Sequence, residues 1–298
     1  MTFSGVFAAL TTPYGRDGSV SLAELKHNLR LYNSTDLLGY VALGSTGEAV
    51  LLARAEMDAI LATVKEAAAK EKILLAGTGA ESTGETIERT KRAAEFGYHV
   101  ALVKPPHYYK PAYKPEALIA HFRRVADESP IPVMLYSIPQ FTGVTLSTAE
   151  VAALAEHPNI IGIKDSSGNV QGTGDFVAAT PAAFNVLIGN AATLYPSFVV
   201  GARGGILALA SALPEKCVKL FELIRRGHHE KARELQSVVA RASKLIVSEL
   251  GLTGVKYVMD QRGYRGGLPR LPLLPLHDEQ KKRLSEFLAT LEPAAVRA

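Results

Sequence analysis

Short apolar runs alternate with longer segments of helical periodicity along most of the chain. The apolar runs, such as residues 40–43 and 132–136, contain no regular polar alternation, which is typical of parallel strands covered on both faces. Between them, residues 21–33 have apolar side chains at helical spacing behind Ser21, an expected N-cap. The pattern predicts strands at residues 7–11, 40–43, 72–76, 99–104, 132–136, 159–164, 184–188 and 204–208, and helices at residues 21–33, 54–70, 83–96, 114–128, 147–156, 170–179 and 192–200.

This order of elements indicates a parallel sheet with right-handed crossovers. Eight strand–helix units favour an α/β fold that closes into a (β/α)8 TIM barrel, and an open doubly wound sheet is the alternative. The remaining helical patterns exceed what a barrel needs; they cover residues 214–226, 229–250, 253–263 and 278–291. We therefore expect a barrel over residues 1–226 and a C-terminal helical region, residues 227–298, packed on it.

Composition narrows the class of protein. Of 298 residues, 47% are hydrophobic and 21% charged, which is typical of a globular chain. The net charge of +4 comes from interspersed charges, so no nucleic-acid partner is expected. The lone Cys217 suits a reducing, cytoplasmic location. We expect no signal peptide and no membrane span, because Pro196 and Arg203 interrupt the longest weakly charged stretch.

Polar residues that follow the apolar runs should form one site, because a TIM barrel places its chemistry at the C-terminal ends of its strands. Lys164 ends one run and is either a structural ion pair or a reactive amine. Tyr136 ends another run, and an amine beside a phenol suits Schiff-base chemistry. Lys104 is a rival, because it also ends an apolar run. No metal-ligand cluster or cofactor motif is apparent, and we expect neither.

The segment Gly44-Ser45-Thr46-Gly47-Glu48 directly follows a predicted strand. Its glycines and hydroxyl residues can turn backbone N–H groups toward a carboxylate, or form an ordinary turn. Gly77-Thr78-Gly79 resembles a dinucleotide loop without its third glycine, so we do not expect a nucleotide cofactor.

Together these residues resemble the dihydrodipicolinate synthase / N-acetylneuraminate lyase family of class I pyruvate aldolases. The resemblance covers essentially the whole chain; its motifs are residues 44–48, Tyr108-Tyr109, residues 136–139 with Thr142-Gly143, residues 162–166 and residues 204–206. The family implies a TIM barrel, pyruvate or another 2-oxo acid plus an aldehyde as substrates, and a homotetramer built as a dimer of dimers.

The resemblance also implies roles for individual residues. Lys164 would form the Schiff base, and Tyr136 would transfer protons. Ser45 and Thr46 would hold the pyruvoyl carboxylate, with Thr46 relaying protons to Tyr136. Tyr109 would complete that relay in a neighbouring subunit, and Gly189 and Ile206 would line the pocket.

Two positions depart from the synthases of this family. Phe141 stands where they carry an arginine for the aldehyde's carboxylate, and Ser45 replaces a threonine. The chain is more similar to the 4-hydroxy-2-oxoglutarate aldolase branch, in which Ser166 would contact the far end of the substrate, although that branch commonly has asparagine at Thr46. We therefore expect a 4-hydroxy-2-oxo acid aldolase. The alternatives are 4-hydroxy-tetrahydrodipicolinate synthase, which condenses pyruvate with aspartate semialdehyde, and a non-catalytic barrel that binds 2-oxo acids.

Overall fold

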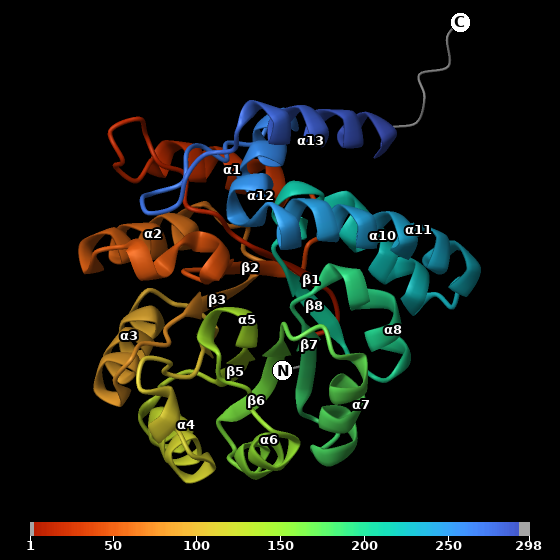
Figure 1. Cartoon of the computed structure of the whole chain (residues 1–298). Coiled ribbons are helices and arrows are strands. Elements are labelled where there is room, and N and C mark those ends of the chain that lie inside the picture. Colours follow the sequence, from red (N-terminus) through yellow and green to blue (C-terminus); the bar gives the residue numbers. More distant parts are fainter. Residues whose placement is uncertain (1–2, 292–298) are drawn as a thin grey trace, which may run out of the picture.

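Eight parallel strands close into a barrel in the computed structural model, which describes residues 3–291 (Figure 1). Each strand pairs with its neighbour in sequence, and β8 pairs with β1. The strands are β1 (Val6–Ala9), β2 (Gly39–Ala42), β3 (Ile73–Gly77), β4 (Val100–Val103), β5 (Val133–Ser137), β6 (Ile160–Asp165), β7 (Asn185–Ile188) and β8 (Gly204–Leu207). The predicted TIM barrel is confirmed, and the open-sheet alternative is wrong.

A ring of helices surrounds the strands, as the periodicity predicts. These helices are α1 (Leu22–Asn33), α2 (Arg54–Ala67), α3 (Thr83–Glu95), α4 (Pro115–Glu128), α6 (Thr148–Ala155), α7 (Val170–Ala179) and α8 (Leu194–Val199). Ser21 caps α1 as expected, because its side chain accepts a hydrogen bond from the Glu24 N–H. Periodicity does not reveal the short helices α5 (Pro139–Thr142) and α9 (Leu209–Ala212), since four residues are too few for a periodic pattern.

The C-terminal helices gather on one side of the ring, beside α1 (Figure 1). They are α10 (Pro214–Arg225), α11 (His229–Ala242), the π-helix η5 (Ser243–Glu249), α12 (Gly251–Gln261) and α13 (Asp278–Leu291). The prediction of one regular α-helix over residues 229–250 is wrong at its C-terminal end. There the helix widens into the π-helix η5, and Gly251, with φ of +62°, separates η5 from the rest of α12.

One hydrophobic cluster extends from Ala8 in β1 to Leu284 in α13. The boundary expected at residue 226 therefore marks no gap in the core, and the division into two regions stays a prediction. Residues 292–298 of the expected C-terminal region lie outside the described residues. Within residues 3–291 we find no helix with the length and apolar character needed to cross a membrane.

The N-terminal end of the barrel is closed by its own chain. Phe3 is fully buried there, and its N–H donates to the Asn185 side chain at the start of β7 at 3.1 Å. The Asn185 amide in turn donates to the carbonyl of Ile161 at 2.9 Å. A ligand must therefore enter from the opposite end, where the strands finish.

His121 on α4 makes the stability of the fold depend on pH. It is buried beside Thr83, 3.0 Å from that hydroxyl, and desolvation lowers its pKa to about 4. Because the unfolded chain binds the proton near pH 6.5, acidification below that value favours unfolding. We expect the free energy of unfolding to fall by up to about 3 kcal/mol between pH 7 and pH 4 through this residue.

Urea unfolding at a series of pH values measures this effect. In His121→Leu the decrease should be smaller by that amount, whatever the stability of the variant at pH 7. The matched control is His228→Asn, at an exposed position, which should keep the pH dependence of the unmodified protein. An unchanged dependence in His121→Leu would contradict the prediction.

Candidate active site

Strands β5 and β6 bring Tyr136 and Lys164 together. The two residues are direct partners in the parallel register, so both side chains point into the barrel. Both are almost fully buried, and the Lys164 Nζ lies 4.0 Å from the centre of the Tyr136 ring. The sequence-based pairing of an amine with a phenol is therefore present in the fold.

Lys164 has no carboxylate partner among the described residues. Asp165 follows it directly but belongs to the opposite face of the strand, where its carboxylate accepts hydrogen bonds from the Ser167 N–H and hydroxyl. Burial raises the pKa of Asp165. The structural ion pair that the sequence left open is absent there, which favours the reactive-amine interpretation.

A cavity of about 290 Å³ opens at the C-terminal end of the barrel, over Lys164 and Tyr136. Its lining contains Ser45, Thr46, Phe141, Ser166 and Gly189, which the sequence selected. Lys164 is the only lysine among the lining residues, and they include no arginine, histidine, aspartate or glutamate. The amine is thus the one basic group available to a ligand in this cavity.

The loop after β2 supplies the hydroxyl groups. Ser45 and Thr46 begin the short 3-10 turn η1 (Ser45–Gly47), whose first backbone N–H groups have no acceptor within the turn. The Ser45 Oγ lies 3.4 Å from the Tyr136 hydroxyl. Within residues 3–291, no hydrogen bond joins Thr46 to Tyr136, although both residues line the cavity.

Gly189 leaves room for two neighbouring side chains. A Cβ atom at this position would lie 1.8 Å from the Ser166 Oγ and 3.1 Å from the Lys164 Cε. Ser166 lies two residues beyond Lys164 and points to the same cavity. The absence of a side chain at Gly189 is therefore a condition for the observed positions of both.

Three of the predicted site residues lie outside the cavity or at its entrance. Ile206 is fully buried in the core with Tyr136 and is not among the residues that line the cavity. Tyr109 is 68% exposed on the loop after β4 and stacks edge-on against Tyr108. Phe141 lines the cavity at α5 but is 70% exposed, which places it at the entrance.

Lys104, the rival amine, is outside the cavity. Its Nζ lies 3.5 Å from a Glu81 oxygen and 3.2 Å from the His107 ring, and burial lowers its pKa. Lys104 thus has the ion-pair partner that Lys164 lacks, and this difference distinguishes the two lysines.

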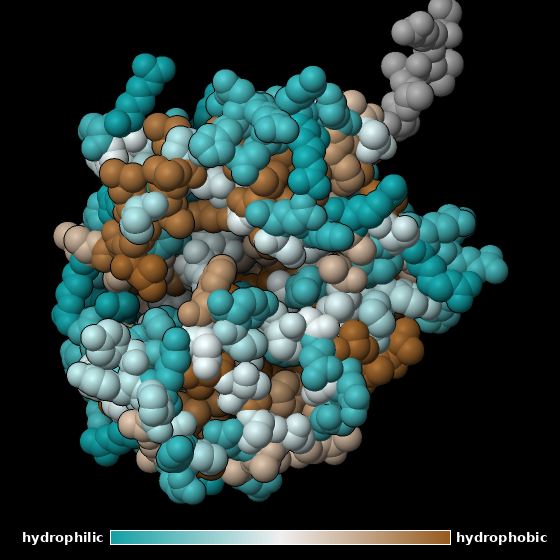
Figure 2. All heavy atoms as spheres, viewed as in Figure 1, coloured by the Kyte–Doolittle hydropathy of each residue, from teal (hydrophilic) through white to brown (hydrophobic). Residues whose placement is uncertain are grey.

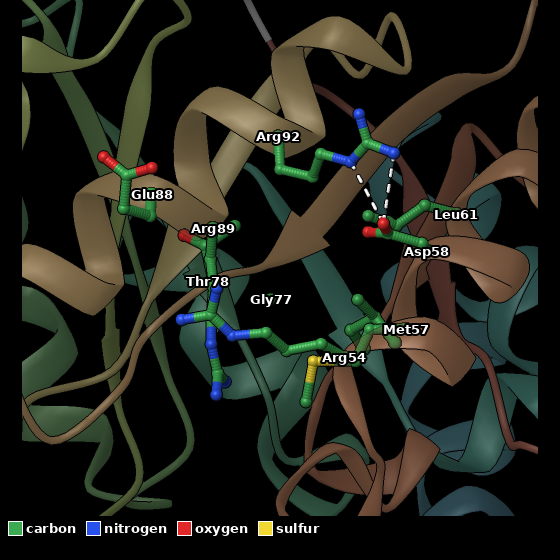
Figure 3. Close-up of a pocket in the computed structure, with 10 residues that line it drawn as sticks. Arg54, Met57, Asp58, Leu61, Gly77, Thr78, Glu88, Arg89 and Arg92 are labelled. Atoms are coloured by element: carbon green, nitrogen blue, oxygen red, sulfur yellow. Dashed lines mark hydrogen bonds and ion pairs between the residues drawn. The ribbon is translucent and has the colours of Figure 1, made fainter.

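A second cavity lies between α2 and α3 (Figure 3). Arg54, Arg89 and Arg92 surround it, but each pairs with a carboxylate; the dashed lines mark Arg92 with Asp58. Arg54 and Arg89 share the Glu85 carboxylate, so each of the three guanidinium groups already has an acidic partner. In the described part of the chain, no group of three or more His, Cys, Asp or Glu side chains could hold a metal ion.

The pattern of the sequence does not reveal one wall of the active-site cavity. The C-terminal helices η5 and α12 contribute it, through Ser243, Val247, Ser248, Gly251, Leu252 and Val255. The π-helical widening at the wall could not be foreseen from periodicity, although Gly251 was a visible break in the pattern.

A TIM barrel with a buried amine and a phenol in one cavity is typical of enzymes that act on carbonyl compounds through a lysine. The chain belongs to the dihydrodipicolinate synthetase family, whose family model matches residues 2–291. Members of this family are lyases of the class I pyruvate aldolase type, and so is this protein.

Individual relatives differ in the reaction that their names give. A 4-hydroxy-tetrahydrodipicolinate synthase of Exiguobacterium sp. is 35% identical, over 95% of this chain and 96% of its own. A probable mitochondrial 4-hydroxy-2-oxoglutarate aldolase of Emericella nidulans is 36% identical, over 95% and 93%. The dihydrodipicolinate synthase of Acinetobacter baumannii, solved in complex with pyruvate, superposes with a TM-score of 0.91, at 31% identity over 97% and 98%.

Gly189→Ala should disable the site. The added methyl group has to displace Ser166 or Lys164, and a shift of about 1 Å in a reacting group can cost on the order of 10²-fold in rate. We expect kcat to fall by about that factor while the unfolding midpoint changes little. The control is Gly84→Ala on α3, where an added Cβ meets nothing within 4 Å. Near-normal turnover in Gly189→Ala would show that the site tolerates the methyl group.

Proposed function

We propose that the protein is a Schiff-base-forming, pyruvate-dependent aldolase that cleaves or forms a 4-hydroxy-2-oxo acid such as 4-hydroxy-2-oxoglutarate. The observation that carries this proposal is the buried Lys164 amine, without a carboxylate partner and 4.0 Å from the centre of the Tyr136 ring. The pyruvate complex of the similar synthase from Acinetobacter baumannii supports the choice of ligand.

The proposed reaction starts when the Lys164 amine adds to the C2 carbonyl of the substrate. Tyr136 donates the proton with which the carbinolamine loses water, leaving a protonated imine. Removal of the C4 hydroxyl proton then breaks the C3–C4 bond, which releases the aldehyde, and the bonding electrons form an enamine. Protonation at C3 and hydrolysis give pyruvate and free Lys164. No metal or cofactor is required for these steps.

Ser45 and Thr46 would hold the pyruvoyl carboxylate through the N–H groups that begin η1. Thr46 would relay protons to Tyr136, as the resemblance implies, and the 3.4 Å contact between the Ser45 Oγ and the Tyr136 hydroxyl supports a part for Ser45 in the same relay. Ser166 would contact the far end of the substrate.

We further propose a cytoplasmic homotetramer in which Tyr109 completes the relay of a neighbouring subunit. The exposed position of the Tyr108–Tyr109 pair, outside the cavity of its own subunit, supports this role. Exposed apolar side chains at Val50, Leu271 and Leu274 offer a contact surface. Figure 2 shows brown apolar surface over α2 and over the segment between α12 and α13, at the upper left. The buried free thiol of Cys217 suits a reducing compartment.

Borohydride reduction in the presence of pyruvate tests the mechanism. It should label the protein irreversibly at Lys164, because the imine is reduced to a stable secondary amine. Peptide mass spectrometry locates the label. The label should be lost in Lys164→Ala and kept in Lys104→Ala, the matched variant of the lysine outside the cavity. Labelling that persists without Lys164 would rule out the proposal.

The second candidate is 4-hydroxy-tetrahydrodipicolinate synthase, which is the name of several relatives. Phe141 argues against it, because an exposed ring at the cavity entrance cannot make a bidentate contact with the carboxylate of aspartate semialdehyde. We expect kcat/KM for cleavage of 4-hydroxy-2-oxoglutarate to exceed that for condensation with aspartate semialdehyde by about 10-fold or more, on the scale of one charge-assisted hydrogen bond.

Steady-state kinetics with both substrates provides the comparison. Phe141→Arg should raise the condensation activity relative to cleavage, and Phe141→Leu, which adds no charge, should not. A higher kcat/KM for aspartate semialdehyde in the unmodified protein would make the synthase the correct function.

A further inference from the structure

The loop that carries Ser45 and Thr46 has an unfavourable backbone at both ends. Leu43 and Glu48 have φ of 56° and 55°, and they are the two non-glycine residues with positive φ in the described chain. Side chains with a Cβ disfavour this conformation, which persists where the surrounding structure enforces it. Other parts of the molecule must therefore hold the loop.

Buried charge holds the Glu48 end. A carboxylate oxygen of Glu48 lies 2.6 Å from the Lys256 Nζ, and both side chains are only 1% exposed. The other carboxylate oxygen accepts a hydrogen bond from the Arg270 N–H at 2.9 Å. A carboxylate this deeply buried needs its partners, so the position of Glu48 is tied to that of Lys256.

Lys256 also reaches the loop by a second route, through Thr12. Its ammonium donates to the carbonyls of Thr12 and Leu268, each at 2.8 Å. The Thr12 hydroxyl then donates to the carbonyl of Gly47 at 2.6 Å. The ammonium thus contacts three protein oxygens, and Lys256 is not among the residues that line the active-site cavity. Lys256 therefore acts on the site through its neighbours, and the loop is the part it contacts directly.

The same helix that carries Lys256 also forms part of the cavity wall. Gly251, Leu252 and Val255 of α12 line the active-site cavity, and Lys256 directly follows Val255. A displacement of α12 would therefore change the wall and the loop together.

We propose that Lys256 is a positioning residue, which holds the Ser45–Thr46 loop through Glu48 and Thr12 in the conformation that binds the substrate carboxylate. This inference rests on the carboxylate-binding role proposed for the loop. The positioning role predicts that loss of Lys256 weakens substrate binding. If the Glu48–Lys256 pair only stabilised the fold, its loss would not weaken binding.

The test uses the concentration of pyruvate needed for half-maximal borohydride trapping. In Lys256→Met we expect this concentration to rise by about 10-fold, while the trapping rate at saturating pyruvate changes by less than about 3-fold, as for a loss of uniform binding. Because Lys256→Met leaves a buried carboxylate unpaired, the double variant Glu48→Gln/Lys256→Met is measured as well. It removes both charges and should show the same rise.

Lys72→Met is the matched control. Lys72 is also buried and donates to two backbone carbonyls, those of Thr35 and Leu37, but it precedes β3 at the other end of the barrel. The substitution Lys72→Met should lower the unfolding midpoint and leave the pyruvate concentration for half-maximal trapping unchanged. An equal rise in Lys72→Met, or an unchanged dependence in the double variant, would overturn the proposal.

Hydrogen exchange of the ligand-free proteins separates this inference from the proposed function. The amides of residues 44–48 should exchange faster in the double variant than in the unmodified protein or in Lys72→Met. This readout needs no pyruvate chemistry. If the unmodified protein is not labelled at Lys164, the aldolase proposal fails, whereas unchanged exchange in the loop contradicts the positioning role by itself.

Discussion

The burial of Lys164 without a carboxylate partner is the constraint on which the rest of the site depends. An amine removed from water needs compensation, and here the face of the Tyr136 ring supplies part of it. That arrangement requires β5 and β6 to pair with these two residues opposite each other, which the closed barrel enforces. The same closure leaves one open end, so the amine meets its ligands in a single cavity.

Comparison with two other buried lysines and with the half-buried Lys104 shows what is special about Lys164. Lys72 donates to two backbone carbonyls, and Lys256 donates to two carbonyls and pairs with Glu48. Lys104 pairs with Glu81. These three amines are bound by neighbours that stabilise the fold, whereas Lys164 keeps its nitrogen available to a ligand. On the proposed mechanism, the reactive lysine is the one without a partner, so burial alone does not single it out.

Much of this could be predicted from the sequence, because strands covered on both faces have a distinct pattern and the barrel then fixes where their ends lie. That rule places Lys164 and Tyr136 at strand ends, but it selects Lys104 equally and does not distinguish the two lysines. The pair of Glu48 with Lys256 does not follow from it, since a contact across more than 200 positions leaves no local signal. The contact of Ser45 with Tyr136 depends on how a three-residue turn directs its side chains, which composition does not reveal.

The two walls of the cavity, one from the barrel strands and one from η5 and α12, therefore contact different parts of the substrate on the proposed mechanism. The barrel wall carries the groups proposed to act on pyruvate, and their positions follow from strand register and from the clamped loop. The opposite wall, from η5 and α12, presents Ser243, Ser248 and Leu252, and none of these contacts is needed to expose the amine. On the proposed mechanism the aldehyde half of the substrate extends away from Lys164, toward this second wall and Phe141. Changes there can alter the aldehyde without disturbing Schiff-base chemistry, whereas a change at Lys256 acts on the binding of pyruvate itself.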